Sequence, residues 1–185
     1  MHVQVLLFGA SDVTEVDKNM QVTVAFNHFG KRLVQRMPRC RSGFFHLVNN
    51  DYTHWEMYAI GGSHDATIIS QGNRFIAPPL SQFFKEVKPM PTLFVFFCIF
   101  LSASQGSSPQ IFQSCIRGTA VQVTHRDAPV ALWSKWTWVS DGDVFLNGAR
   151  FVPSGNPDGA RQFAALELIK AAPGTEVFTL TRFSG

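Results

Sequence analysis

The amino-acid sequence predicts an all-β protein, a partial parallel β-helix with an irregular inserted segment and a short helical C-terminal tail. An Asn-x-aromatic triplet begins at Asn27, Asn50 and Asn73, at two successive intervals of 23 residues. Each triplet follows a run of β-branched and aromatic residues, which is typical of a strand. The chain holds 18 Phe, 14 Gly and 10 Pro but only 16% charged residues, which favours many short strands and turns.

Two sets of short strands are expected in each repeat. The first set precedes the Asn triplets, at Val22–Phe26, Phe44–Val48 and Thr67–Ser70. The second set lies between the triplets, at Val5–Phe8, Leu33–Gln35 and Met57–Ile60. Two or three short strands in about 23 residues match the coil of a parallel β-helix.

Stacked coils bring equivalent side chains into register. Asn27, Asn50 and Asn73 should then form an inward ladder, in which the side-chain amides satisfy one another and the turn backbone. The aromatic residues two positions later should stack in the same way. A β-sandwich with three similar turns is the alternative.

The repeat ends after Pro78-Pro79, and the rest of the chain follows another pattern. Trp133, Trp136 and Trp138 lead into a last predicted strand, Asp143–Phe151, and an amphipathic helix is predicted at Asp158–Lys170. The apolar run Leu93–Leu101 has nine residues, about half of what a membrane span requires, so no membrane association is expected.

Charge and cysteine content exclude some classes of protein. The formal net charge of +3 is too small to predict a nucleic-acid coat. Three cysteines, at Cys40, Cys98 and Cys115, do not indicate a disulfide framework.

The densest chemistry lies in a basic cluster, which holds five of the sixteen cations in the eleven residues Lys31–Arg41. Arg39 and Arg41 share one side of an extended strand, and a bend at Pro38 would bring Arg36 beside Arg41. Planar guanidinium groups there would suit carboxylate or phosphate. The alternatives are a solvated basic loop, a nucleic-acid site that lacks any recognised motif, and a site for a polyanionic sugar chain.

Three long segments carry a resemblance to a known family: VTVAFNHFGKRLVQRMPRCRSGFFHLVNNDYTHWEMYAIGG, SQGNRFIAPP and WSKWTWVSDGDVFLNGARFVPSG. They resemble plant pectate lyases of polysaccharide lyase family one, from about Val5 to Phe84 and again from about Val123 to Gly155. The resemblance implies a right-handed parallel β-helix and a secreted, calcium-dependent enzyme of the plant cell wall. Such enzymes degrade pectin by eliminative cleavage of de-esterified (1→4)-α-D-galacturonan.

The resemblance also implies roles for single residues. The family pattern Arg-x-Pro-x-x-Arg matches Arg36, Pro38 and Arg41, so Arg36 would be the base and Arg41 would bind a substrate carboxylate. Arg39 and Lys31 would be further substrate contacts. An arginine base implies an alkaline optimum.

Departures from the family bear on calcium and on activity. The family's Ca²⁺ ligands lie in an Asp-His and an Asp-Gly-Leu-Val-Asp motif, and neither occurs here, so no metal ligand is assigned. Gln4 replaces a lysine that the family often carries. The acids Asp12, Glu15 and Asp17 are interpreted as a solvated loop, and His28, His46 and His54 as core or groove residues.

The domain organisation follows from these matches. Residues 1–86 should form the coils with the arginine motif, residues 87–122 a non-family insertion, and residues 123–185 the late strand and the tail. The codons that Val87-Lys88 and Gln122 permit allow a retained intron translated in frame as the origin of the insertion. We expect a C-terminal fragment of a pectate lyase, a monomer without a signal peptide of its own, with impaired activity on polygalacturonate. The alternative is an inactive fragment or a pectate-binding module that uses the arginine cluster.

Overall fold

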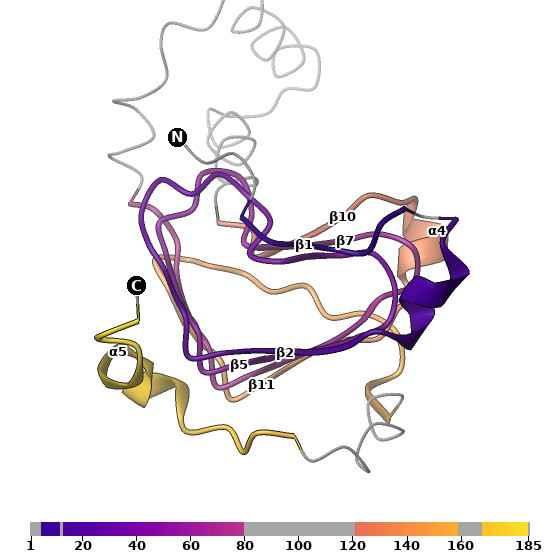
Figure 1. Ribbon diagram of the computed structural model, residues 1–185. Coiled ribbons are helices and arrows are strands. Elements are labelled where there is room, and N and C mark those ends of the chain that lie inside the picture. Colours follow the sequence, from indigo (N-terminus) through magenta and orange to yellow (C-terminus); the bar gives the residue numbers. More distant parts are fainter. Residues whose placement is uncertain (1–4, 12, 80–120, 159–167, 185) are drawn as a thin grey trace, which may run out of the picture.

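The protein is described here from a computed structural model, which covers residues 5–11, 13–79, 121–158 and 168–184. Within these residues three parallel sheets enclose a common interior (Figure 1). Sheet I consists of β1 (Leu7–Phe8), β4 (Arg39–Cys40), β7 (Ile60–Gly62) and β10 (Thr124–Arg126). Sheet II consists of β2 (Gln21–Ala25), β5 (Phe44–Val48), β8 (Thr67–Gln71) and β11 (Trp138–Asp141). Sheet III consists of β3 (His28–Phe29), β6 (Asp51–Thr53), β9 (Arg74–Ile76) and β12 (Val144–Leu146).

The chain visits the sheets in the order I, II, III and then begins the next coil. This order and the parallel pairing confirm the predicted parallel β-helix and exclude the β-sandwich. Its register carries the 23-residue repeat, because His28 pairs with Asp51 and Asp51 pairs with Arg74. The short helices η1 (Glu15–Asn19), α4 (Val130–Trp133), η3 (Gly174–Glu176) and α5 (Val177–Leu180) lie outside the sheets. None of the helices in the described part of the chain is long and apolar enough to span a bilayer.

The predicted asparagine ladder is present, and it has a fourth member. The Asn27 amide donates to Asn50 Oδ1 at 3.0 Å, and the Asn50 amide donates to Asn73 Oδ1 at 3.1 Å. The Asn73 backbone N–H then donates to Asp143 Oδ1 at 2.7 Å. Asn50 and Asn73 also accept the backbone N–H of the preceding rung, so the ladder satisfies turn groups, among them the buried N–H of Asn50.

The predicted aromatic stack runs beside this ladder and also continues into the fourth coil. Successive ring centroids of Phe29, Tyr52, Phe75 and Phe145 lie 4.8, 4.6 and 5.5 Å apart. These separations follow from the spacing of about 4.8 Å between neighbouring strands. The interior also buries Phe45, Leu47, Ile68 and Trp138 completely.

Several predicted boundaries were wrong. The strand expected at Leu33–Gln35 is β4 at Arg39–Cys40, because Arg36 has a left-handed φ of 68° and the chain enters sheet I only after Pro38. Met57–Ile60 is likewise replaced by β7, which begins at Ile60. The last predicted strand ends at Leu146, where Asn147 turns the chain with a φ of 57°.

Two predictions concern segments that lie largely outside the residues that the structure describes. The insertion predicted at 87–122 falls outside it except for residues 121 and 122. The helix predicted at Asp158–Lys170 falls outside it at residues 159–167, and residues 168–170 are not helical.

The C-terminal tail crosses the corner between sheets II and III, where Figure 1 shows it in yellow. The Asn49 amide donates to the Ala172 carbonyl at 2.8 Å and accepts the Ala172 N–H at 2.9 Å. Further along, the Phe178 ring lies 5.1 Å from the Arg74 guanidinium, and Val177 is fully buried.

Candidate functional site on the outer face of sheet I

The outward side chains of sheet I form two rows that cross all four strands. Cys40, Ile60 and Thr124 are fully buried, so the residues that alternate with them face outward. The pairing register aligns the first row as Leu7, Arg39, Gly61 and His125. Backbone hydrogen bonds continue the ladder past the strand ends and align a second row as Gly9, Arg41, Ser63 and Asp127.

Arg36 lies one turn before β4, at the entrance to sheet I. Its carbonyl accepts the Leu6 N–H at 2.9 Å, and its positive φ is followed by a cis Met37–Pro38 peptide. Its Nε is shielded from water and has no hydrogen-bond partner within the described residues. The Nε atoms of Arg39 and Arg41 are likewise shielded from water, and Arg36 as a whole is half-buried.

Arg41 is held by the loop after β1. Its Nη1 donates to the carbonyls of Gly9 and Ala10, at 2.9 Å each. The loop is fixed in turn, because the Ala10 N–H donates to Asp17 Oδ2 at 2.7 Å. Asp17 thus orders backbone carbonyls that position Arg41, which the interpretation of this loop as solvated did not foresee.

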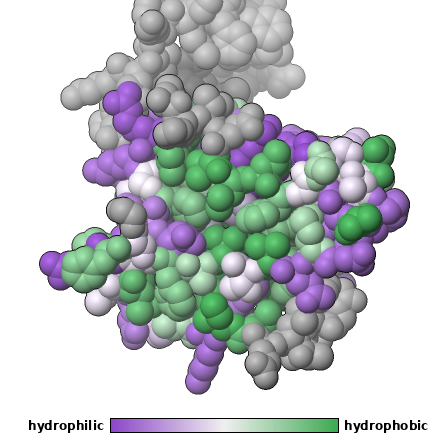
Figure 2. Space-filling view, viewed as in Figure 1, coloured by the Kyte–Doolittle hydropathy of each residue, from purple (hydrophilic) through white to green (hydrophobic). Residues whose placement is uncertain are grey.

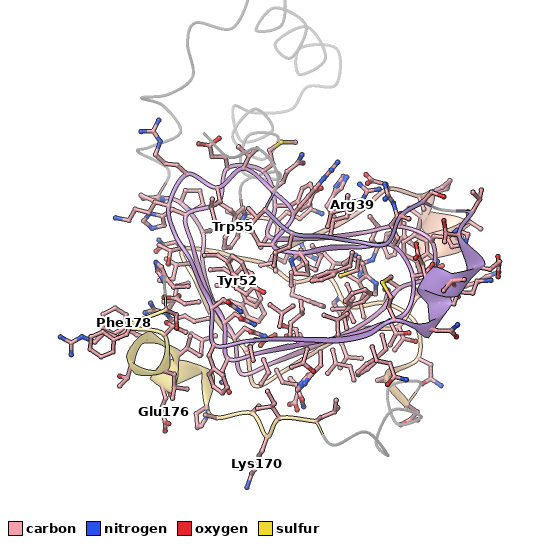
Figure 3. The ribbon with its side chains drawn as sticks, viewed as in Figure 1. Arg39, Tyr52, Trp55, Lys170, Glu176 and Phe178 are labelled. Carbon is pink, nitrogen blue, oxygen red and sulfur yellow. The ribbon has the colours of Figure 1, made fainter. Side chains whose placement is uncertain are left out.

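Arg39 reaches across sheet I. Its Nη1 is ion-paired with Asp127 Oδ2, and its Nη2 donates to Ser63 Oγ at 3.3 Å. Because β7 lies between β4 and β10, the side chain passes beside Ser63, just after β7, to reach Asp127. Figure 3 labels Arg39 at this face.

Tyr58 and His125 complete the surface. The Tyr58 ring occupies the space over Gly61, where a Cβ would lie 2.7 Å from the ring. It stacks on His125 with centroids 4.7 Å apart and planes inclined by 19°. His125 Nε2 lies 2.8 Å from Asp127 Oδ1, so Asp127 contacts both His125 and Arg39.

The other predicted site residues lie elsewhere. Lys31 is exposed in the turn after β3. Burial lowers the pKa of His54, and the charge of Lys31 lowers it further. His28 Nδ1 contacts Asp51 at 3.0 Å, and the buried His46 contacts Gln71 at 3.0 Å, so both take part in contacts between coils. Burial lowers the pKa of His46.

The acidic side chains in the described part of the chain do not gather into a metal site. Glu15 is exposed and paired with Lys18, whose hydrogen bond and charge lower the pKa of that carboxyl. Asp12 lies outside the description. Among the residues described, no three His, Cys, Asp or Glu side chains gather closely enough to hold a metal ion. The described part of the chain therefore does not fit a calcium site.

Sequence reasoning missed Tyr58, His125 and Asp127. Only the strand register could have revealed His125 and Asp127. His125 in β10 lies in line with Arg39, and Asp127, directly after β10, lies in line with Arg41. That register joins segments 88 residues apart, across a stretch with no repeat.

Comparisons with known proteins agree with this architecture. A family model described as pectate lyase matches residues 1–87. The chain is 51% identical to a pectate lyase of Lilium longiflorum over 185 residues, and 50% identical to one of Nicotiana tabacum over 187. Both matches cover 100% of this chain, but 34% and 38% of those relatives.

A solved structure is similar over the same extent. The crystal structure of Jun a 1, the major allergen from cedar pollen, superposes with a TM-score of 0.74 at 34% identity. It covers 100% of this chain, which covers 43% of the solved chain. With parallel coils, an in-register ladder and these similarities together, the chain belongs to the pectate lyase family, and it spans about a third of the length of the curated relatives that it matches.

Proposed function

We propose that this chain is pectate lyase-like and that the outer face of sheet I binds polygalacturonate for eliminative cleavage. The supporting observation is the arrangement around β4, where Arg36 and Arg41 flank a two-residue strand of sheet I. Such a surface suits a polyuronate, since guanidinium groups bind carboxylates through paired hydrogen bonds.

The reaction requires a base and a means of stabilising negative charge. The base takes the proton α to the uronate carboxylate, and that electron pair forms a carbon–carbon double bond. The bond to the glycosidic oxygen breaks, and this oxygen then takes up a proton. Cations close to the carboxylate stabilise the negative charge that develops before the bond breaks. Arg41, ordered by Gly9 and Ala10, is assigned to this carboxylate.

Arg36 is assigned as the base. Arginine is ordinarily protonated, so it has to lose a proton before it can accept one from the substrate. We therefore expect product formation to increase toward alkaline pH. Lys31 is a further proposed substrate contact at the edge of the cluster, and the cell wall is the proposed place of action.

The test follows the unsaturated product by its ultraviolet absorbance, with polygalacturonate at alkaline pH, with and without added Ca²⁺. Arg36→Ala should abolish product formation, whereas Arg182→Ala on the tail should leave it unchanged. Product formation by Arg36→Ala at the wild-type rate would contradict the assignment of the base.

A pectate-binding module without catalysis is the second candidate. The observation in its favour is that the described residues supply no ligand set for a metal ion. It predicts that polygalacturonate is bound without unsaturated product and that Arg41→Ala weakens the binding. A nucleic-acid binder would instead retain RNA with a steep salt dependence and would ignore polygalacturonate.

A further inference from the structure

We propose that Asp127 limits how tightly sheet I binds polyanions, because it neutralises Arg39 and presents its own carboxylate to the approaching chain. The substrate-facing cations are then Arg36 and Arg41, and Arg39 is a structural partner of Asp127. This proposal rests on the proposed function, namely that the outer face of sheet I takes polygalacturonate.

The contacts of Arg39 leave it little freedom to meet a ligand. Its side chain is 11% exposed, and it is engaged at Nη1 by Asp127 and at Nη2 by Ser63. Its backbone N–H donates to the Leu6 carbonyl at 2.9 Å, which fixes the strand that carries it. A uronate carboxylate would have to displace an internal carboxylate to bind here.

Asp127 is the exposed member of the pair and is held from three sides. Its side chain is 38% exposed, more than three times the exposed fraction of Arg39. Its N–H donates to the Gly62 carbonyl at 2.9 Å, and its second carboxylate oxygen faces His125 at 2.8 Å. A polyanion that approaches this end of the row therefore meets the carboxylate before it meets the guanidinium.

The distance between Arg41 and Asp127 determines how strongly the Asp127 carboxylate repels a polyanion bound at Arg41. Arg41 follows β4 and Asp127 follows β10, but the Arg41 guanidinium turns toward the loop after β1, three strands from β10. Three strand spacings place the two charges about 14 Å apart. This is less than two Debye lengths at physiological salt and well within the Debye length of about 30 Å at 0.01 M, so the interaction is strongest at low salt. A polyanion bound at Arg41 is thus repelled by Asp127.

The experiment measures the affinity of the folded chain for polygalacturonate by calorimetric titration. Asp127→Asn keeps the shape and a hydrogen-bond acceptor for Arg39 but removes the negative charge. At low salt we expect about 1.5- to sevenfold tighter binding, the range that Coulomb's law gives for one charge at about 14 Å in a medium between water and a protein surface. The gain should shrink at high salt. The matched control Asp141→Asn, an exposed carboxylate on sheet II, should not change the affinity.

A double variant separates the charge of Asp127 from any direct contact of Arg39. Arg39→Gln combined with Asp127→Asn removes both members of the pair and preserves the local net charge. We expect binding within about twofold of wild type, since no substrate contact is lost and no net charge changes. If Asp127→Asn does not fold, as judged by circular dichroism, Asp127→Ser carries the same test.

The outcomes are distinct. An Asp127→Asn chain that binds no more tightly than wild type overturns the proposal. So does a double variant that loses as much affinity as Arg41→Gln, because Arg39 would then be a substrate contact. If Arg41→Gln itself leaves binding unchanged, or if the wild-type chain does not bind polygalacturonate, the proposed function fails as well.

Discussion

Asp143 closes the amide ladder as a buried carboxylate. Its Oδ2 accepts the hydroxyls of Ser70 at 2.6 Å and Ser140 at 2.7 Å, and its Oδ1 accepts from Asn73. Burial raises the pKa of Asp143, and these hydrogen bonds offset only part of that increase. The ladder thus ends on a group whose proton affinity depends on the fold.

This shift predicts a pH dependence of stability. A raised folded-state pKa adds stability that is fully present below the unfolded pKa of about 4 and is lost as the pH rises through the folded pKa. Asp143→Asn can keep hydrogen bonds to Asn73 and Ser70 but does not titrate. Its free energy of unfolding, measured in urea, should therefore rise relative to wild type as the pH increases above about 4. Parallel pH curves for the two proteins would contradict this prediction.

Arg126 shows that a cation can also point into the β-helix. Its guanidinium lies 4.6 Å from the Trp133 ring and 4.0 Å from the Trp138 ring, and it donates to the Val152 carbonyl at 2.6 Å. Burial lowers the pKa of Arg126 to about 10. The two rings and the carbonyl compensate for the water that this side chain has lost. Arg126 thereby joins α4, β11 and the segment after β12.

At the scale of elements, the asparagine turns connect sheets II and III in every repeat. Asn50 is fully buried and is the middle rung. Its Oδ1 accepts from Asn27, and its amide nitrogen donates to the Val24 carbonyl at 2.7 Å and to Asn73 Oδ1 at 3.1 Å. Asn27 is exposed at the end of the ladder. The two positions share one chemistry but differ in burial.

This difference predicts unequal costs of removing the amide. Asn50→Ala leaves several buried groups without partners and should reduce the free energy of unfolding by about 3 kcal/mol or more. Asn27→Ala should cost about 1 kcal/mol, because water replaces what is lost. Denaturant unfolding of both variants measures the difference. Equal costs would mean that the ladder does not act through buried hydrogen bonds.

At the scale of the whole molecule, the tail holds three successive coils together. It contacts Asn49 through Ala172, and Gly174 packs so closely on the carbonyls of Asn73 and Gly142 that a Cβ would lie 2.9 Å from each. Figure 2 shows a broad apolar surface on the face toward the viewer. Figure 3, in the same view, labels Glu176 and Phe178 at the margin of this face. The described part of the tail, residues 168–184, thus covers the ladder corner on the side of the molecule opposite sheet I (Figure 1).

Release of the tail can be tested at Asn49. Asn49 has a φ of 50°, so Asn49→Gly removes the amide without backbone strain. Asn49→Gly removes a hydrogen bond to the Gly72 carbonyl and two hydrogen bonds to the tail. Loss of the two hydrogen bonds to the tail, about 1–2 kcal/mol, should speed tryptic cleavage after Lys170 by about tenfold. Asn147→Gly, at a φ of 57° on the far side of β12, is the matched control and should not change the rate. Cleavage at equal rates in both variants would show that Asn49 does not hold the tail.

The sequence by itself determined the strands of sheet II and the asparagine turns in the first three coils. A constant interval of 23 residues places Asn27, Asn50 and Asn73 at equivalent positions of successive coils. Their ladder and the stack of Phe29, Tyr52 and Phe75 therefore follow from spacing alone. The same applies to β2, β5 and β8, whose β-branched and aromatic residues indicate strands without reference to the rest of the chain.

Only the tertiary structure decided the fourth coil and the charge balance of the candidate site. Asp143 and Phe145 continue the ladder and the stack after an interval of 70 residues, which no repeat in the sequence reveals. Arg39 was predicted as a substrate contact from the resemblance to the family, and its ion-pair partner Asp127 is 88 residues away. Spacing specifies contacts between equal repeats, whereas a partner across unequal segments depends on which strands the folded coils bring together.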